Sequence, residues 1–334
     1  MTDDPKAVTL ESVGKLAGVS RSTVSRVING LPGVSERAEQ AVQDAINQLG
    51  YIPNNMARGL ATRRAAVVTA LIPEKMDRFF GDPFFGSVIS GIEDYMSETP
   101  LVLNLMVTSE KAFQKTLAFL AGGQSDGILV LSHHTSHEMV EALERRVPVV
   151  YGGRPLRDPT HATYVDADNR DGARKAVQHL VDRKCQRIAM ITGPDDMPSG
   201  KERLWGFMDV TEESGTLGPI ENGDYSAQSG ANAARRLLAK HEPFDGLFVA
   251  NDLMARAAVD ILLASGKRIP DDVAVVGFDD SKAAVSSEPL LTTVRQDSWK
   301  QGWLMAQLIT EMIGGATEPR SIQLPTSLVV RETA

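Results

Sequence analysis

Residues 20–29 read SRSTVSRVIN and combine two kinds of side chain in a helical repeat. Val24, Val27 and Ile28 recur on one face, as the packing residues of an amphipathic helix do. The opposite face carries basic, hydroxyl and amide donors without an acidic residue, which suits the phosphates and base edges of a DNA groove. An ordinary helical hairpin with a polar outer face is the alternative. The donors of this face are Arg21, Ser22, Ser25, Arg26 and Asn29.

Two helices joined by a turn are expected to hold this face outward. Thr9 is suited to cap a first helix, Gly18 to end it with a positive φ, and Ser20 to cap the second helix. A helix-turn-helix places the start of its second helix against base edges in the major groove, so Arg21 and Ser22 are the expected readers. The first helix is expected to pack through Leu10, Val13, Leu16 and Ala17.

A third amphipathic helix gives the hairpin a core. Ser35 is suited to cap this helix, and Gly50 is suited to end it. Three such helices bury one small core together, which makes a DNA-reading headpiece a better interpretation than a bare hairpin. The apolar positions of the third helix are Ala38, Ala41, Val42, Ala45, Ile46 and Leu49.

The same stretch matches the headpiece strings of a known family. The chain resembles the lactose-repressor (LacI/GalR) family of bacterial transcriptional regulators in VTLESVGKLAGVSRSTVSRVING at 8–30, VSE at 34–36 and GYIPNNMARGL at 50–60. The resemblance extends nearly to the C-terminus and implies a homodimeric repressor that binds palindromic operator DNA. The DNA-binding residues that we expect are Thr9, Ser20, Arg21, Ser22, Thr23, Ser25, Arg26, Asn29, Asn54, Arg58 and Leu60.

The segment after the headpiece is expected to be a hinge. Pro53 suits the first turn of a short helix over 54–62, but a segment this short lies below the ~12–15 residues that an isolated helix needs in water. The resemblance implies that two hinges pair across the dimer and insert Leu60 into the minor groove, where such a wedge kinks the duplex. The alternative is a flexible linker. Arg58, Arg63 and Arg64 fit phosphate contacts.

Composition bounds the class of protein. With 334 residues, the chain is long enough for two or three domains. The net charge is −8, but residues 1–64 carry a net charge of +2 and the remainder −10, as expected for a DNA-reading headpiece on an acidic body. A single cysteine, Cys185, an N-terminus without a signal peptide and the absence of a membrane-spanning apolar run predict a cytoplasmic protein. The end at SLVVRETA, without leucine heptads, predicts a dimer.

From residue 65, continuous apolar runs alternate with helical patterns. Runs without polar alternation indicate strands buried on both faces, hence parallel sheets covered by crossover helices. The predicted fold class is therefore α/β, with a three-helix headpiece followed by two doubly wound halves. The expected strands are AVVTALI, LVLNLMV, GILVL, PVVYGG, RIAMITG, GLFVAN and VAVVGFDD, and the expected helices lie near 84–96, 111–120, 136–145, 169–182, 201–213, 226–240 and 252–265.

The expected domains are a headpiece over 1–53, a hinge and linker over 54–64, and an effector-binding and dimerisation core over 65–334. The resemblance implies a periplasmic-binding-protein-like core whose two subdomains are joined by three crossings. The crossings are expected near 155–162, 290–297 and 318–326, which gives an N-subdomain over 65–158 and 297–320 and a C-subdomain over 159–296 and 321–334.

Ligands of doubly wound sheets bind beyond the carboxyl ends of the strands, so a small molecule is expected between the two halves. Carboxylate, amide and guanidinium groups bind hydroxyls, and aromatic faces cover the apolar side of a pyranose, so these residue types suit a sugar or a sugar derivative. The resemblance implies that Asp168, Arg203, Asn251 and Asp279 contact the effector and that Tyr225 packs on it. The candidates at strand ends and helix starts are Phe84, Phe85, Asp168, Arg203, Trp205, Asn251, Asp279 and Asp280.

Structural roles remain open for several of these residues. Asp168 and Asn251 are also suited to cap helices, Arg203 to form a salt bridge, and Asp279 to cap the following turn. Ser298 stands where some sugar-binding members of the family carry an aromatic residue, so the stacking partner on that side is unassigned.

Other functions are less favoured. The chain lacks a Walker loop, a G-x-S-x-G elbow and an HExxH motif, and we expect neither an enzyme nor a cofactor. His133, His134 and His137 have no partner at ligand spacing, so no metal site is assigned. A purine-type or other non-sugar corepressor is the main alternative ligand. A solute-binding protein is more remote, and a glycosidase using Asp279 and Asp280 is disfavoured because neighbouring residues on a strand point apart.

We predict that Arg21→Ala weakens specific operator binding by about 1–3 kcal/mol, the value of one good base-edge contact, while nonspecific DNA binding changes little. Titration of both proteins against operator and random duplexes measures this difference. An equal loss on the two duplexes would show that Arg21 contacts phosphate instead.

Overall fold

The computed structural model describes residues 8–28, 30–51, 65–109, 112–132, 134, 143–155 and 160–334. It divides into two compact units, residues 1–65 and 66–334, which are described separately. The predicted hinge over 54–64 lies outside the described residues. No helix in the described part of the chain has the length and apolarity needed to cross a membrane.

The first unit is the predicted headpiece, with α1 (Leu10–Ala17), α2 (Arg21–Ile28) and α3 (Glu36–Leu49). Thr9 caps α1 by accepting a hydrogen bond from the Ser12 amide, and the C-cap Gly18 has φ 68°. These caps confirm the predicted start and end of the first helix. The buried apolar side chains of the three helices are Val13, Val24, Val42 and Ala45.

Leu16 corrects the predicted face of the first helix. Its side chain is 45% exposed, whereas Val13 is fully buried. Three short helices enclose a narrow core, so the buried stripe of α1 is narrower than the apolar pattern of the sequence.

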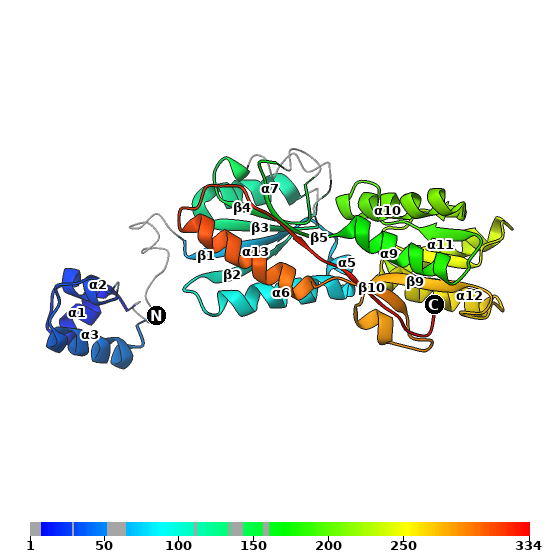
Figure 1. The fold of residues 1–334 in the computed structure, drawn as a ribbon. Coiled ribbons are helices and arrows are strands. Elements are labelled where there is room, and N and C mark those ends of the chain that lie inside the picture. Colours follow the sequence, from blue (N-terminus) through cyan, green and yellow to red (C-terminus); the bar gives the residue numbers. More distant parts are fainter. Residues whose placement is uncertain are drawn as a thin grey trace. The chain divides into compact units, whose positions relative to one another are not determined.

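The second unit is a two-lobed α/β structure, which confirms the predicted fold class (Figure 1). Lobe 1 contains a six-stranded parallel sheet in the order β11-β5-β4-β3-β1-β2. Its strands are β1 (Val67–Ile72), β2 (Val102–Val107), β3 (Gly127–Leu131), β4 (Val149–Gly152), β5 (Thr163–Ala167) and β11 (Ser321–Leu324), and its helical segments are α5 (Met76–Gly81), α6 (Pro83–Met96), α7 (Phe113–Phe119), η2 (Leu120–Gln124) and α13 (Ser298–Ile313).

Lobe 2 repeats this plan with the strand order β12-β10-β9-β8-β6-β7, in which the β10–β12 pair is antiparallel. Helices α9 and α10 cover one face of the sheet, and α11 and α12 cover the other (Figure 1). The strands are β6 (Ile188–Ile191), β7 (Leu217–Glu221), β8 (Gly246–Val249), β9 (Ala274–Asp279), β10 (Thr292–Arg295) and β12 (Ser327–Val329), and the helices are α9 (Asn169–Asp182), α10 (Pro198–Ser214), α11 (Ala227–Ala239), α12 (Asp252–Ala264) and η3 (Lys282–Val285).

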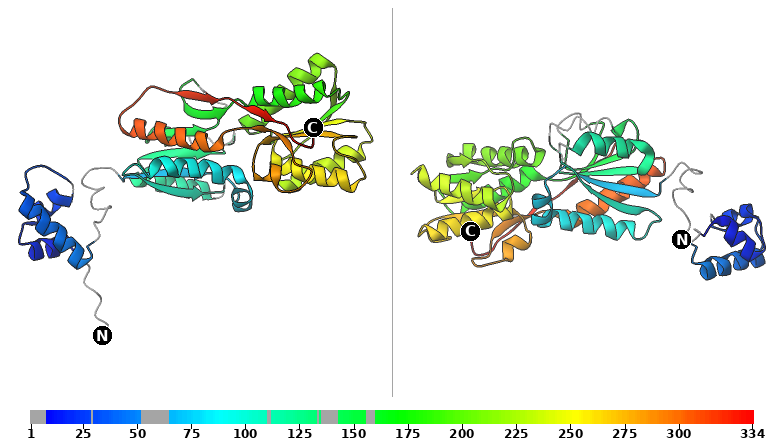
Figure 2. Two further views of the ribbon diagram at one scale, coloured as in Figure 1. Left: turned by 60° about the horizontal axis from the view of Figure 1, so that its bottom comes forward. Right: turned by 180° about the vertical axis from the view of Figure 1, so that it is seen from behind.

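The lobes exchange chain at three connections: β5 to α9, β10 to α13, and β11 to β12 (Figure 2). β5 and β11 pair with each other in the lobe 1 sheet, so the first connection follows residue 167 and the predicted boundaries at 159 and 321 fall too early. The reason is that β11 alternates between exposed and half-buried residues, and β5 contains the polar residues Tyr164 and Asp166. Neither strand is a continuous apolar run, which is the pattern that predicts a strand buried on both faces.

The helices that the sequence predicts agree closely with those observed, and α9 spans the predicted residues 169–182. Most of the predicted helix near 136–145 lies outside the described residues. The elements that were not predicted are α5, α13, β5, β7, β10, β11 and β12.

Helices α6 and α13 pack with their backbones in contact on one face of lobe 1. A Cβ atom added to Gly91 of α6 would overlap the carbonyl oxygen of Trp299, and one added to Gly302 of α13 would overlap that of Val88. Both positions therefore require the absence of a side chain.

We predict that Gly91→Ala lowers the free energy of unfolding by about 1–3 kcal/mol, because overpacking forces the two helices apart. Gly86→Ala in the same helix is the matched control: it meets no atom within 4 Å and gains the helix propensity of alanine, worth about 0.5–1 kcal/mol. Urea unfolding of both variants measures the difference. Equal midpoints would show that α6 and α13 accommodate the extra methyl group.

Candidate functional site

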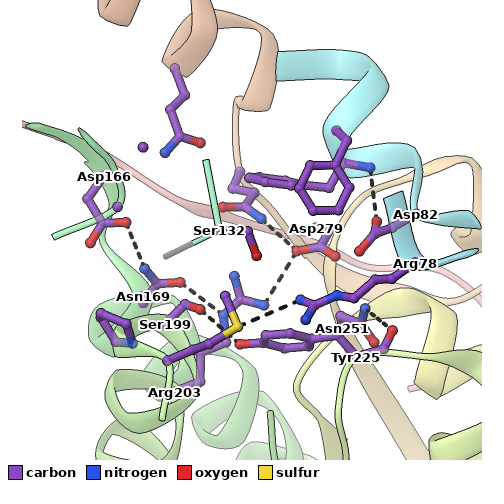
Figure 3. Close-up of a pocket in the computed structure, with 18 residues that line it drawn as sticks. Arg78, Asp82, Ser132, Asp166, Asn169, Ser199, Arg203, Tyr225, Asn251 and Asp279 are labelled. Carbon is purple, nitrogen blue, oxygen red and sulfur yellow. Dashed lines mark hydrogen bonds and ion pairs between the residues drawn. The ribbon is translucent and has the colours of Figure 1, made fainter. Parts of the chain in front are cut away.

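A pocket lies between the lobes, where the carboxyl ends of both sets of parallel strands meet (Figure 3). This is the position expected from the topology of doubly wound sheets. Lobe 1 contributes Arg78, Asp82, Phe84, Phe85, Ser132, Gly152, Gly153, Asp166 and Gln301, and lobe 2 and its connections contribute Asn169, Met197, Pro198, Ser199, Arg203, Tyr225, Asn251, Asp279 and Gln296.

Arg203 of α10 organises the lobe 2 side of the pocket and is only 4% exposed. Its Nε donates to Asn169 Oδ1 at 2.9 Å, and its Nη1 donates to the carbonyl of Ala250 at 2.5 Å and contacts Asp279 Oδ1 at 3.4 Å. The guanidinium also lies 3.6 Å from the centre of the Phe278 ring. Arg203 thus forms a salt bridge, which is the structural alternative for this residue, and it also lines the pocket.

Asp279 ends β9 and faces the same space. Gln296 Nε2 donates to its Oδ1 at 2.6 Å, and burial raises the pKa of Asp279 well above its ordinary value, although Arg203 opposes the rise. Asp280 points elsewhere: its carboxylate binds Arg295 at 2.7 Å and Arg331 at 2.6 Å. The two neighbouring acids therefore have different roles, one at the pocket and one as an anchor of the turn.

Three pocket residues have an unusual backbone conformation. The φ angles of Ser132, Tyr225 and Asp279 are 58°, 70° and 116°. A residue with a side chain pays about 1–3 kcal/mol for such angles, and these angles concentrate at functional sites where surrounding contacts hold them. Their convergence on one pocket supports a binding role.

Tyr225 supplies an aromatic surface in the wall of the pocket. Its ring centre lies 5.5 Å from the guanidinium carbon of Arg78 and 5.7 Å from that of Arg203, and its hydroxyl is 3.0 Å from Ser199 Oγ. Asn251 holds the backbone of this tyrosine, since its Nδ2 donates to the Tyr225 carbonyl at 3.0 Å. Asn251 also caps α12, so its capping role and its place in the pocket coexist.

Two expected residues do not line this pocket. Asp168 caps α9 by accepting a hydrogen bond from the Asp171 amide at 3.1 Å, and Trp205 is 46% exposed. Trp205 follows Arg203 by two helical positions, about 200° around α10, and so faces away from it. Ser298 is buried at the start of α13 and does not line the pocket either.

Asp166 and Asn169, on either side of Asp168, were missed. Asn169 Nδ2 donates to Asp166 Oδ1 at 3.1 Å, and burial raises the pKa of Asp166 to about 6. Recognition of β5 and β10 as strands would have revealed Asp166 and Gln296 at their ends. Arg78 and Asp82 follow β1, as does Phe84, a predicted residue that lines the pocket. No pattern in the sequence predicts α5, which turns Arg78 toward the pocket.

The charges of the pocket favour a neutral polar ligand. Arg78 and Arg203 are already paired, with Glu74 at 2.7 Å and Asp279 at 3.4 Å respectively. Asp82 and Asp166 add further carboxyl groups, and burial raises the pKa of each. No unpaired cation lines the pocket among the described residues, so an anion would meet carboxyl groups without compensation. Hydroxyl groups, in contrast, pair with both acids and guanidinium groups.

The lobes are also linked beside the pocket. His134, after β3 of lobe 1, has Nδ1 2.7 Å from Asp196 of lobe 2 and Nε2 3.2 Å from Glu74 of lobe 1. Glu74 further accepts a hydrogen bond from Ser132 at 2.5 Å. His133 and His137 lie outside the described residues, among which no group is arranged to hold a metal ion.

The polar face of the headpiece is assembled largely as the sequence predicts. Arg21 forms an ion pair with Glu11 at 2.9 Å, and because both side chains are well exposed, this pair is weak and leaves Arg21 available for the predicted DNA contact. Ser20 Oγ accepts a hydrogen bond from the Thr23 amide at 3.2 Å, which confirms its capping role.

Other expected DNA-binding side chains have intramolecular partners. Arg26 Nη2 donates to the carbonyl of Pro32 at 3.1 Å, and the Ser22 and Thr23 hydroxyls lie 2.7 and 2.9 Å from Ser20 Oγ. The DNA contacts themselves remain predictions. Asn29, Asn54, Arg58 and Leu60 lie outside the described residues.

Comparisons with known proteins match both units. The family described as bacterial regulatory proteins, lacI family, matches residues 9–54, and the periplasmic binding protein-like domain matches residues 177–334. The HTH-type transcriptional regulator CelR of Thermobifida fusca is 43% identical over 334 residues, covering 97% of this chain and 98% of that protein.

Two solved structures agree with this match. A transcriptional regulator CelR–cellobiose complex has a TM-score of 0.78 at 40% identity and covers 98% of this chain and 100% of that chain. A lac repressor dimer bound to operator and the anti-inducer ONPF has a TM-score of 0.88 at 26% identity and covers 98% and 99%.

The link through His134 predicts that closure of the lobes depends on pH. Burial lowers the pKa of His134, but the hydrogen bonds and charges of Glu74 and Asp196 outweigh it and raise the pKa above the ordinary value of about 6.5. Opening removes Asp196, so the open form has the lower pKa. The link therefore stabilises the closed form fully below the open-form pKa and is lost as pH rises through the closed-form pKa.

We expect the lobes of the wild type to separate more at about pH 8.5 than at about pH 6, and His134→Gln to lose this part of the response. Distances between spin labels on exposed Glu98 of lobe 1 and Glu213 of lobe 2 measure it. His134, Glu74 and Asp196 line a second cavity, to which Lys75, Asp77, Arg78 and Asp224 also contribute. Burial raises the pKa of Glu202 to about 7, so the difference between the two proteins is the relevant quantity. Identical pH profiles would exclude His134 from closure.

Proposed function

The chain belongs to the lacI family of bacterial regulatory proteins, and on this premise we propose that it is a repressor controlled by cellobiose or a closely related neutral β-glucoside. The resemblance seen in the sequence is thereby confirmed, and the protein is a DNA-binding transcriptional regulator. The identity of its effector and its operator contacts are proposals.

The observation that carries the sugar assignment is the buried Arg203–Asp279 pair facing the pocket beside Tyr225. A fixed guanidinium and a carboxyl group bind neighbouring hydroxyls, while the aromatic ring covers an apolar sugar face. The cellobiose of the CelR complex supports a β-linked glucose disaccharide as the specific ligand.

A purine-type corepressor remains the second candidate ligand from the sequence. The carboxyl groups at Asp82, Asp166 and Asp279 favour a ligand rich in hydroxyl groups over a flat base with few of them. We propose binding without catalysis, since the relatives are transcriptional regulators. An operator-binding protein acts beside the chromosome, so we place it in the cytoplasm.

We propose that the protein binds a near-palindromic operator as a homodimer, because two headpieces on a two-fold axis require two half-sites. The hinge over 54–62 is too short to be a stable helix alone, so its order depends on the partner hinge, the minor groove and the spacing of the two cores. A ligand that changes the angle between lobes changes this spacing. Operator binding responds to the ligand only if the ligand has different affinities for the two arrangements of the lobes.

The proposal predicts that two defects are separable. Asp279→Ala should lose the response to cellobiose while operator binding without ligand survives, because the carboxyl group acts in the pocket. Leu60→Ala should weaken operator binding with cellobiose affinity unchanged, because it removes the minor-groove wedge. Asp271→Ala, which alters an exposed acid before β9, is the control for Asp279 and should leave both properties unchanged.

Calorimetric titration with cellobiose, glucose, sugar phosphates and purines, beside operator binding with and without each compound, tests these expectations. An Asp279→Ala protein with a normal response would remove this pocket from the mechanism. Full operator affinity in Leu60→Ala would show that the hinge only connects the headpiece to the core. A response to purines alone would show that the effector is a purine and not a sugar.

A further inference from the structure

Arg78 of α5 projects from lobe 1 toward lobe 2 at one end of the pocket (Figure 3). Its Nη1 binds Glu74 at 2.7 Å, its Nη2 lies 3.7 Å from Met197 Sδ, and its guanidinium lies over the ring of Tyr225. The Nε of Arg78 is buried and has no hydrogen-bond partner among the described residues. A buried donor without a partner is unfavourable, so this nitrogen favours a ligand oxygen.

Asp82 lies four residues further along and supplies the complementary acceptor. Its Oδ1 accepts a hydrogen bond from the Phe84 amide at 3.0 Å, which caps α6, and no partner of Oδ2 is seen among the described residues. Burial raises the pKa of this carboxyl group, and the charge of Arg78 lowers it in part. Both side chains line the pocket, and they lie on the side away from Asp166 (Figure 3).

We propose that Arg78 and Asp82 form a second sugar-binding subsite, on lobe 1, which makes the protein select a disaccharide over a monosaccharide. This inference rests on the proposed function. Arg203, Asp279 and Asn251 of lobe 2 bind one ring, and the second ring places a hydroxyl or ring oxygen at Arg78 Nε and a hydroxyl at Asp82 Oδ2. A donor and an acceptor held side by side match the adjacent hydroxyls of a pyranose.

Arg78 also limits the length of the ligand. It lines a second cavity together with Glu74, His134, Asp196 and Asp224, so its side chain forms the wall between that cavity and the pocket. A third ring would have to displace Arg78 from Glu74 and from the face of Tyr225. The same residue thus accepts the second ring and obstructs a third.

The experiment compares the affinities of glucose, cellobiose and cellotriose for the full-length protein by calorimetry. The wild type is expected to bind cellobiose at least 10-fold more tightly than either other sugar. Arg78→Met removes all donors at similar length, and Asp82→Ser removes the carboxylate but keeps a helix-capping hydroxyl. Each variant should lose about 10- to 100-fold in cellobiose affinity, the equivalent of one hydrogen bond to a charged group, with glucose affinity changed by less than about 3-fold.

Lys75→Met is the matched control, because Lys75 is an exposed cation that lines the second cavity and not the pocket. Its ratio of cellobiose to glucose affinity should equal that of the wild type. An unchanged ratio in a folded Arg78→Met or Asp82→Ser protein would overturn the second subsite, as would a wild type that binds glucose as tightly as cellobiose. A wild type that binds none of the three sugars would instead refute the proposed function.

Discussion

The burial of one positive charge, the Arg203 guanidinium, is the constraint on which the pocket depends. A charged group taken out of water must be paired and hydrogen-bonded, or its desolvation destabilises the fold. Arg203 meets this requirement with groups from α9, the end of β8 and the end of β9, so three elements are fixed around one side chain. The φ of 116° at Asp279 is tolerated within the same arrangement. Lobe 2 therefore presents its polar groups already oriented.

Two side chains of lobe 1 contact this prearranged surface of lobe 2. Arg78 contacts Met197 and Tyr225, and His134 contacts Asp196. The two crossing side chains share Glu74, which binds both of them. A change at either one is thus felt by the other through a buried carboxylate. If the proposed function holds, ligand and proton act on the same motion, the closure of the lobes, although they bind at different atoms.

The sequence predicted the parts of the site that follow continuous apolar runs. Arg203, Asn251 and Asp279 belong to this class, because buried parallel strands are recognisable and the residues after them lie at one edge of a sheet. Asp166 lies within β5 and Gln296 directly follows β10, and neither strand is a continuous apolar run that the sequence pattern would reveal. Arg78 depends on a short helix of six residues, α5, whose direction is set by tertiary packing. The local sequence pattern therefore predicts the pocket residues of lobe 2 better than those of lobe 1.

The interleaved connections also determine when each lobe becomes complete during synthesis. A growing chain emerges from its N-terminus, and its domains fold as they become available. Lobe 1 begins at residue 66, yet its helix α13 and its strand β11 are made only after most of lobe 2. The sheet of lobe 2 is in turn complete only when β12 has been made and pairs with β10. The face of α6 around Gly91 stays uncovered on the ribosome until the segment 298–313 has been made, so neither lobe can be completed before most of the other has been synthesised.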